Sequence, residues 1–279
     1  MRLTQAPVTA GPGRYDVRMF IRSFLALTAR ARSRRTNRQL GAVLAFVAGA
    51  INAGGFLAVH RYTSHMSGIV SGVGDDLVLG NLALSLAGLA ALVSFTSGAA
   101  CTALMVNWAR RQGLHGEYAM PLMAEAVLLL AFGLLGAHLQ LMLQVFVPST
   151  VLLLCFVMGL QNAIVTKVSR AEIRTTHMTG VITDIGLELG RLAYWNRRPE
   201  ANARHFVRAD REKLAIHATM LALFFAGGVV GAWMFKRVGF SATVPFAMLL
   251  MAMAAPPLLR DVSARRSSAA CQEVVDGSL

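Results

Sequence analysis

Charged residues are scarce in this chain: Asp, Glu, Lys and Arg make up 15% of its 279 residues, whereas a soluble domain carries about 25%. Hydrophobic residues make up 55%, and the mean hydropathy is +0.54. These values exclude an ordinary soluble protein and indicate a chain that crosses a membrane several times. Acids are the scarcer charge, with 14 against 27 lysines and arginines. In a membrane protein such an excess is expected in cytoplasmic loops, so it predicts no nucleic-acid partner.

Cysteines and catalytic motifs are also in short supply. Cys101 and Cys155 lie in apolar runs and Cys271 in a polar tail, and no CxxC or Cys/His cluster indicates a zinc site. The sequence has no HExxH, no GxSxG and no phosphate-binding glycine loop. Its loops are too short for a separate catalytic domain. We therefore predict neither an enzyme nor a cofactor.

The first 38 residues form a basic tail with nine arginines and one acid, Asp16. No apolar run in it has the length of a signal-peptide core. Apolar residues recur there at helical spacing: Val17, Phe20, Ile21, Phe24 and Leu25. This pattern is typical of an amphipathic helix on a bilayer with anionic lipids. A disordered tail and an organellar transit peptide are the alternatives.

Six apolar runs reach the length of about 20 residues that crosses the hydrocarbon core as a helix. They are residues 40–59, 83–107, 120–140, 150–168, 214–235 and 241–259. Two further apolar segments, 68–80 and 180–193, reach only about 20 Å as helices, short of a core of about 30 Å. We predict that these two are re-entrant or half-length helices.

The basic residues favour this six-span arrangement. If the short segments do not cross and both termini are cytoplasmic, 24 lysines and arginines fall inside and three outside. If both short segments cross, the numbers become 19 and eight. Since basic residues concentrate in cytoplasmic loops, six spans are preferred. The region 66–107 is nevertheless long enough for two tightly joined spans, so the alternative stays open.

A short motif occurs twice, as TSHMSG at 63–68 and TTHMTG at 175–180. Its surroundings repeat as well, because AFVAGAINA at 45–53 aligns with CFVMGLQNA at 155–163. An acid follows each motif at an equivalent position, Asp76 in the first half and Glu188 in the second. Three spans in each half give the halves opposite orientations in the membrane, which is a 3+3 inverted repeat.

The predicted fold is therefore an all-α polytopic membrane protein of four parts. Residues 1–38 are a basic cytoplasmic tail and residues 39–140 the first membrane repeat. Residues 150–260 are the second membrane repeat, and residues 261–279 a cytoplasmic C-terminal tail.

Inverted repeats usually place their substrate near the midplane, where interrupted helices of the two halves meet. We expect this site where residues 64–76 meet residues 176–188. The candidates for a substrate or ion pathway are Asn52, His65, Asp75, Asp76, Asn162, His177, Asp184, Glu188 and Arg191. The repeated motif adds Ser64, Met66, Ser67, Gly68, Thr176, Met178, Thr179 and Gly180, with Ser64 and Thr176 or Ser67 and Thr179 as N-caps.

Each candidate also has a structural interpretation. Inserting a charged side chain at the centre of a membrane helix costs about 2.5–3.5 kcal/mol on insertion scales, so each such residue calls for a functional or structural explanation. Asp184 and Glu188 share a helix face. They form either a proton or cation relay, or carboxylates at the cytoplasmic end that are solvated or paired with Arg191. Glu125, near the end of its span, is expected at the interface in contact with water.

The repeated histidines and asparagines have two interpretations as well. The histidines carry protons or brace the turn before the short helix. The asparagines join neighbouring helices or line a pathway. Met66 and Met178 next to histidines suggest a Cu(I) site. Adjacent helical residues point about 100° apart, however, and make a poor chelate, so we predict no metal.

GAINA and MGLQNA, followed by HMSG and HMTG, resemble the YoaK family of bacterial inner-membrane proteins, which is defined by a domain of unknown function. The resemblance covers about residues 40–260. Ile69 stands where that family often has Asn, and an Asp that it often has near Asn52 is missing, which indicates a divergent subgroup. The resemblance implies a multi-pass protein of the bacterial inner membrane and names no substrate.

The function predicted is a small secondary transporter or channel for a polar metabolite or ion. The alternative is a non-transporting membrane scaffold or sensor that uses the basic tail. The partners are the lipid bilayer and an unidentified small solute, and self-association into a homo-oligomer stays open.

Overall fold

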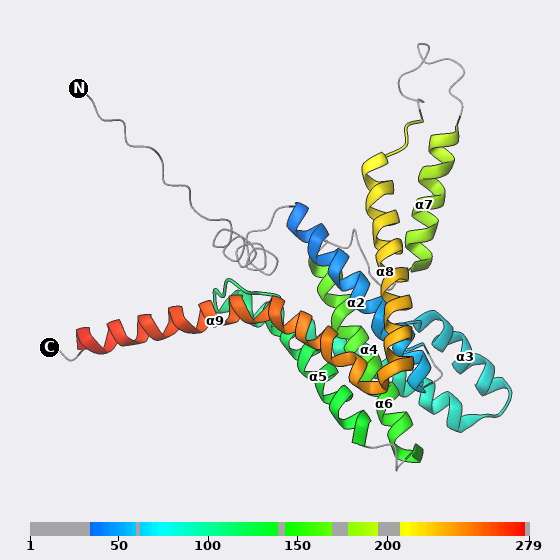
Figure 1. Cartoon of the computed structure of the whole chain (residues 1–279), viewed down its shortest axis with the longest axis horizontal. Coiled ribbons are helices and arrows are strands. Elements are labelled where there is room, and N and C mark those ends of the chain that lie inside the picture. The colour runs from blue at the N-terminus through cyan, green and yellow to red at the C-terminus, as the bar shows by residue number, and fades with distance from the viewer. Residues whose placement is uncertain (1–33, 60–61, 139–142, 169–177, 195–206, 277–279) are drawn as a thin grey trace, which may run out of the picture.

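The computed structural model of the chain describes residues 34–59, 62–138, 143–168, 178–194 and 207–276, and all regular secondary structure in them is helical (Figure 1). The α-helices are α2 (Arg34–Val59), α3 (Met66–Val78), α4 (Leu82–Arg111), α5 (Ala119–His138), α6 (Leu143–Val168), α7 (Met178–Ala193), α8 (Arg211–Val238) and α9 (Thr243–Asp276). A 3-10 turn, Gly239–Ala242, joins α8 to α9. Each predicted run and short segment coincides with one helix, so the all-helical prediction is confirmed. Most of the basic tail lies outside the described residues.

Four segments of the described chain are long and apolar enough to cross a membrane. They are Thr36–Leu57, Leu82–Arg111, Pro148–Lys167 and Arg211–Ala264, the last of which contains both α8 and the first part of α9. Helix α5 adds a shorter apolar stretch, Ala119–Leu134. The chain is therefore a multi-pass membrane protein.

Helices α2 and α6 form the centre of the bundle, and more than half of their apolar stretches is buried by the rest of the protein. They run antiparallel: the Gln161 side chain donates a hydrogen bond to the Leu44 carbonyl at 3.4 Å, whereas Gly55, further along α2, lies against Leu154, which is earlier in α6. Helices α4 and α8 bury much less and expose apolar side chains such as Leu104 and Phe225. These outward apolar surfaces suit contact with lipid.

Helix α8 packs closely and in parallel along α2, because Gly41, Ala50 and Gly54 of α2 lie against Met220, Gly231 and Phe235 of α8 in that order. Gly49 on α2 faces the main-chain carbonyl of Phe224, and Gly227 on α8 faces the carbonyl of Phe46. A Cβ added at either glycine would lie 2.0 Å from that carbonyl oxygen, so no larger residue fits without separating the helices. Small residues of this kind let membrane helices approach through their backbones.

Helix α6 packs on α4 in the same way, through glycines that face backbone carbonyls. Gly98 on α4 faces the carbonyl of Phe156, and Gly159 on α6 faces the carbonyl of Phe95, with added Cβ atoms 2.1 and 2.0 Å from the respective oxygens. The Thr102 hydroxyl also donates to the Leu160 carbonyl at 3.0 Å. Ser94, Gly98 and Thr102 of α4 contact Leu152, Phe156 and Leu160 of α6 in that order, so this pair is parallel as well. Gly159 is the residue that the sequence repeat aligns with Gly49.

The remaining long pair, α5 and α9, is antiparallel. Near the start of α5, the backbone N–H of Gly116 donates to Asp261 on α9 at 3.0 Å. Near the end of α5, Gly133 lies against Thr243, the first residue of α9, and the Phe132 ring packs edge-on against Phe240. Each long helix therefore has its main partner in the other half of the chain.

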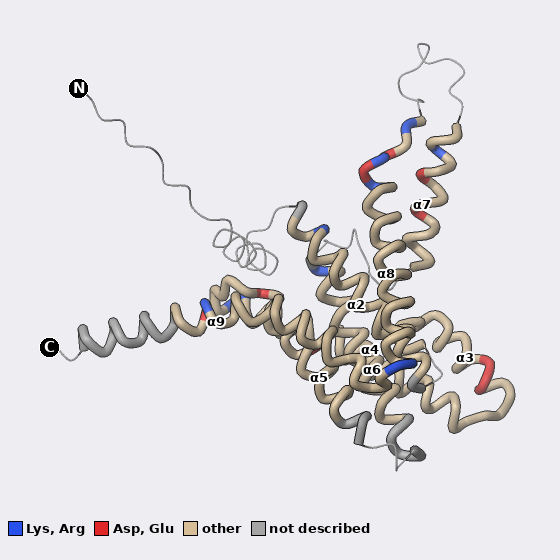
Figure 2. The backbone as a smooth tube through the Cα atoms, viewed as in Figure 1, with Lys and Arg blue, Asp and Glu red and all other residues tan. Residues whose placement is uncertain are grey.

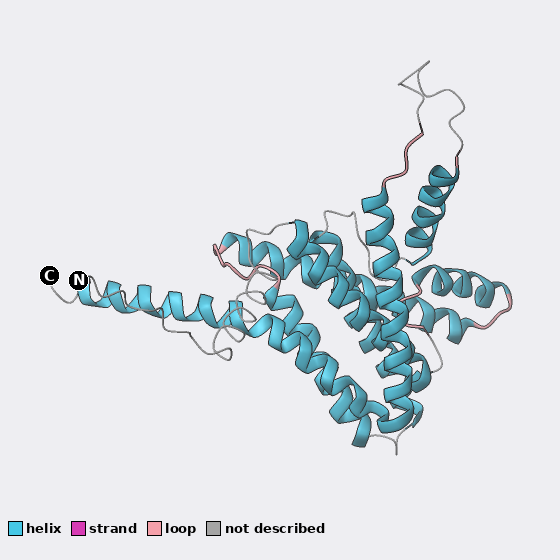
Figure 3. Cartoon of the chain, turned by 45° about the horizontal axis from the view of Figure 1, so that its top comes forward, coloured by secondary structure: helices cyan, strands magenta, loops and turns pink. Residues whose placement is uncertain are grey.

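The two short helices form hairpins with the helices that follow them, α3 on α4 and α7 on α8. Figures 1 and 3 show that their first turns lie close together and that the helices then run apart. The site expected where 64–76 meets 176–188 stays a prediction, and the main packing partner of each short helix is the helix that follows it. Within the described residues, only their N-terminal ends approach each other.

Charged residues lie mostly near the helix ends, chiefly on the α7–α8 hairpin and where α4, α5 and α9 meet (Figure 2). Glu125 is an exception: it lies within α5, and 0% of its surface is exposed. The prediction that Glu125 lies in water at the interface is therefore wrong. Its position near the start of α5 suggested solvent, but the packing of α9 and α6 on α5 covers it.

Candidate functional site

The first copy of the repeated motif is held to α2 by a side-chain hydrogen bond. The Ser64 hydroxyl donates to the Asn52 side-chain oxygen at 2.7 Å. His65 is the N-cap residue of α3, and its side chain makes no capping hydrogen bond. The prediction of Ser64 or Ser67 as the N-cap is therefore wrong for this copy, since Ser64 is bonded to Asn52 and Ser67 is already helical.

His65 and Gly68 are spaced so that the imidazole lies over the glycine. A Cβ added at Gly68 would approach the His65 Nδ1 to 3.0 Å, so a larger residue there would displace the ring. This contact is the one expected if the histidine braces the turn before α3. Of the second copy, Thr176 and His177 lie outside the described residues.

Asn52→Ala and Ser64→Ala are expected to be non-additive. Each single change should destabilise the protein by about 1 kcal/mol, and the double variant should cost little more than either, because the two side chains share one hydrogen bond. Thermal unfolding of the four proteins in detergent measures this. Full additivity would show that the bond contributes nothing. Ser67→Ala, in the exposed first turn of α3, is the control.

A hollow of about 280 Å³ lies beside this motif. Its lining includes His65, Asp76 and the rings of Phe56 and Tyr62, which stack with centroids 4.5 Å apart. Neither the Asp76 carboxylate nor the exposed Asp75 carboxylate has a hydrogen-bond or ion-pair partner among the described residues. The hollow therefore combines aromatic faces with a carboxylate available to a polar ligand.

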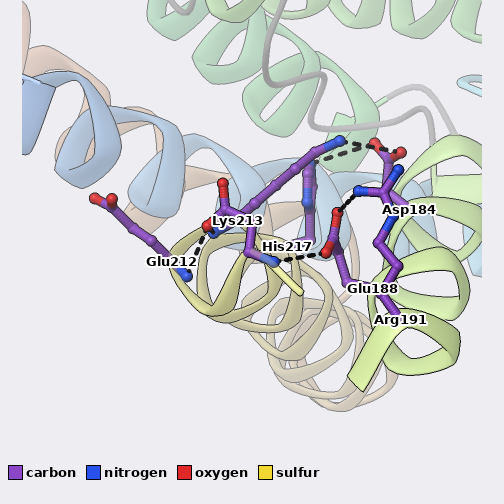
Figure 4. Close-up of polar contacts among 7 residues, drawn as sticks. Asp184, Glu188, Arg191, Glu212, Lys213 and His217 are labelled. Atoms are coloured by element: carbon purple, nitrogen blue, oxygen red, sulfur yellow. Dashed lines mark hydrogen bonds and ion pairs between the residues drawn. The ribbon is translucent and has the colours of Figure 1, made fainter. Parts of the chain in front are cut away.

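The second half carries a paired cluster between α7 and α8 (Figure 4). Glu188 is 1% exposed, and both of its carboxylate oxygens are occupied. One accepts a hydrogen bond from Arg191 at 2.7 Å, and the other accepts from the backbone N–H of Asp210 at 2.8 Å. The Glu188–Arg191 pair, one of the two interpretations of the sequence, is present in the structure.

Asp184 faces two cationic side chains of α8. The Lys213 ammonium lies 3.4 Å from one carboxylate oxygen, and the His217 Nε2 lies 3.6 Å from the other. The second contact is an ion pair only when the imidazole is protonated. His217 is buried, and its Nδ1 has no hydrogen-bond partner in the described structure. Both carboxylate oxygens of Asp184 therefore lie near basic side chains of α8.

The first turn of α8 also belongs to this cluster, through Asp210 and Glu212. The Asp210 side chain accepts hydrogen bonds from the backbone N–H groups of Glu212 and Lys213, both at 3.0 Å, and so caps the helix. Glu212 pairs with Arg38 of α2. Sequence reasoning missed Lys213, Asp210 and the role of His217. The available signal was spacing, because Lys213 and His217 are four apart, as Asp184 and Glu188 are.

Comparison with known protein families identifies the family of the chain. Residues 40–255 match the model of a family described as a protein of unknown function, DUF1275. The chain belongs to the DUF1275 family. No curated protein and no solved structure matches it. The DUF1275 match begins at Leu40, where burial in α2 becomes complete, and covers both halves of the bundle.

The two halves of this DUF1275 protein place equivalent acids in different surroundings. Asp76 borders the open hollow, whereas Glu188 is buried and paired. The described residues contain no group of three or more His, Cys, Asp or Glu side chains arranged to hold a metal ion. Of the other motif residues, Met66, Ser67 and Gly68 form the first turn of α3, and Met178, Thr179 and Gly180 that of α7. Asn162 lies half-buried on α6.

Proposed function

We propose that this DUF1275 protein is a small secondary transporter or channel for a polar metabolite or ion, located in the bacterial inner membrane with both termini in the cytoplasm. The observation that carries the proposal is the matched packing of the halves. Helix α2 meets α8, and α4 meets α6, each through two glycines that face backbone carbonyls. Matched halves in opposite orientations are the plan of many secondary transporters.

The directions of the helix pairs support six spans. Successive spans alternate in direction, so parallel pairs must differ by an even number of crossings and antiparallel pairs by an odd number. With α3 and α7 not crossing, α2 and α8 are spans one and five, α4 and α6 are spans two and four, and α5 and α9 are spans three and six. The α2–α8 and α4–α6 pairs are parallel and the α5–α9 pair is antiparallel, which agrees with this numbering.

Counting the short helices as spans disagrees with the same contacts. If α3 crossed, α2 and α6 would run parallel, but their contacts are antiparallel. If only α7 crossed, α2 and α8 would run antiparallel, but they are parallel. The lengths agree as well, since α3 has 13 residues and α7 has 16, against about 20 for a full span.

The proposed orientation predicts that the ends of α3 and α7 face opposite sides of the membrane. Leu79 and Tyr194 end the two hairpins and are exposed, so each can be replaced by cysteine after the native cysteines are changed to serine. A membrane-impermeant maleimide should label Leu79→Cys only from outside and Tyr194→Cys only from inside. Arg208→Cys, close to Tyr194 across the same hairpin, should follow Tyr194→Cys. Labelling of both ends from one side contradicts the inverted repeat.

Solute flux tests the function itself. Liposomes that contain the protein should release entrapped ions or small organic acids faster than empty liposomes. Asp76→Asn combined with Asp184→Asn should slow this release several-fold, because both carboxylates are accessible to ligands and only partly compensated. Asp75→Asn, on the exposed side of α3, is the matched control. Flux that the double variant leaves unchanged counts against these residues as a pathway.

The alternative function is a non-transporting scaffold or sensor. The observation in its favour is that Glu188, the most buried acid of the α7–α8 cluster, is compensated within the protein. This alternative predicts no protein-dependent flux for any solute. It also predicts that removal of residues 1–33 abolishes the cellular phenotype, while substitutions in the repeated motif leave it intact.

A further inference from the structure

Glu125 on α5 is the one buried acid of the described chain that has no partner. It is 0% exposed, and neither carboxylate oxygen has a hydrogen-bond partner. The other buried acids are compensated. Glu117 pairs with Arg110 at 2.8 Å, Glu188 with Arg191, and Asp261 accepts the backbone N–H groups of His115 and Gly116.

The buried residues next to Glu125 on α5 are apolar. Helices α5 and α9 pack on each other, and their buried residues recur 121 positions apart: Leu122, Ala126 and Leu129 on α5, and Thr243, Ala247 and Leu250 on α9. The same spacing pairs Glu125 with Phe246, which is 4% exposed. An apolar side chain therefore satisfies the equivalent packing, and the carboxyl group of Glu125 calls for another explanation.

Physical chemistry restricts what an isolated carboxyl group here can do. An ionised carboxylate buried without a partner costs several kcal/mol or more, whereas the neutral acid costs much less. The helices packed on α5 carry few charged groups within the described residues: Arg110 and Arg111 on α4, Lys167 on α6, and Arg260 and Asp261 on the part of α9 that packs there. None of them hydrogen-bonds to Glu125. The group can therefore lose its proton only when water or a cation reaches it.

We propose that Glu125 is a proton-binding site inside the bundle, which holds a proton as the neutral acid and releases it to water when the bundle opens. In the transporter proposed above, and only if that proposal holds, this is the proton that is coupled to solute movement. The site is distinct from the α7–α8 cluster, because α5 packs on α9, α6 and α4 and has no comparable packing on α7.

A hydrophobic carbodiimide tests the proton site without any assumption about transport. The reagent adds the carboxylic acid across its carbodiimide bond and rearranges to a stable N-acylurea, so the labelled peptide gains the mass of the whole reagent. Mass spectrometry of the full-length protein in detergent should find this adduct on Glu125 and not on the compensated Glu117 or Asp261. Labelling should fall about tenfold for each pH unit beyond the titration midpoint of the group. Glu125→Gln should remove the adduct.

Two variants separate a functional role from a structural one. Glu125→Leu replaces the carboxyl group with an apolar side chain at this buried position and should fold with an unchanged or higher Tm, as should Glu125→Gln. Failure of both variants to fold shows that the bundle needs the carboxyl group and overturns the proposal. Absence of the carbodiimide adduct at every pH in the folded wild-type protein overturns it as well.

The coupling is tested in liposomes with a pH-sensitive dye inside. Glu125→Gln should abolish proton movement that accompanies solute flux, while Glu117→Gln, at a buried acid that pairs with Arg110, should leave it in place. An adduct on Glu125 in a protein without any flux supports the proton site and rejects the transporter. Proton-coupled flux that Glu125→Gln leaves unchanged retains the transporter and rejects Glu125 as its coupling site.

Discussion

Gly49→Ala is expected to destabilise the protein by about 3 kcal/mol, a large effect for the addition of one methyl group. The new Cβ would lie 2.0 Å from the carbonyl oxygen of Phe224 and 3.0 Å from the backbone of Gly228. Both neighbours are backbone, so no side-chain rotation relieves the overlap, and α2 and α8 must move apart. Thermal unfolding in detergent should show a Tm lower by about 10 °C.

Gly72→Ala is the matched control for this prediction. Gly72 also lies inside a helix, α3, but a Cβ added there meets nothing within 4 Å. Alanine favours a helix over glycine by up to about 1 kcal/mol, so Gly72→Ala should have an equal or higher Tm. Equal responses of the two variants would contradict the close α2–α8 contact. Gly159→Ala, at the aligned position on α6, should match Gly49→Ala.

Glu188→Ala is expected to loosen α7 from α8 and to cost about 2–3 kcal/mol. The change leaves the backbone N–H of Asp210 without its acceptor and Arg191 without its carboxylate. Since the Arg191 side chain is half exposed, it can turn to solvent, and most of the cost comes from the N–H group. Thermal unfolding and the protease sensitivity of the α7–α8 hairpin measure the effect.

Glu188→Gln and Asp75→Ala complete this comparison. The glutamine keeps an acceptor for Asp210 but loses the charge beside Arg191, so its Tm should fall between those of Glu188→Ala and the wild type. Asp75→Ala removes an exposed acid on α3 and should change stability by less than about 0.5 kcal/mol. A Glu188→Ala protein as stable as the Asp75→Ala protein would show that the buried pair is dispensable.

The helices were predictable from the sequence, because hydropathy and length are local properties. The long apolar run at 150–168 lies in the 26-residue α6, and the short apolar segment at 68–80 corresponds to the 13-residue α3, so the length of the run predicted the length of the helix. The Glu188–Arg191 pair was foreseeable for the same reason, since it joins residues one helical turn apart. The repeat also pointed to Gly49 and Gly159 as equivalent positions.

Helix pairing was not predictable, because it depends on which faces meet across long stretches of chain. Nothing near Asp184 indicates that Lys213 and His217 lie opposite it, and nothing near Ser64 indicates that its hydroxyl bonds to Asn52. The burial of Glu125 was missed for this reason, since α9, at the far end of the chain, covers α5. The N-cap prediction also failed on a tertiary contact, because Ser64 bonds to α2.

The pairing of helices across the two halves has a consequence for biosynthesis. Helix α2 leaves the ribosome first among the long helices, but the surface that fits Gly49 and Gly54 belongs to α8, which is made close to the end. The surface of α2 that contains these glycines therefore has no packing partner in the bilayer until α8 has been synthesised. The two halves expressed as separate polypeptides in one cell should accordingly be stable only together, and each half alone should be a substrate for membrane quality-control proteases.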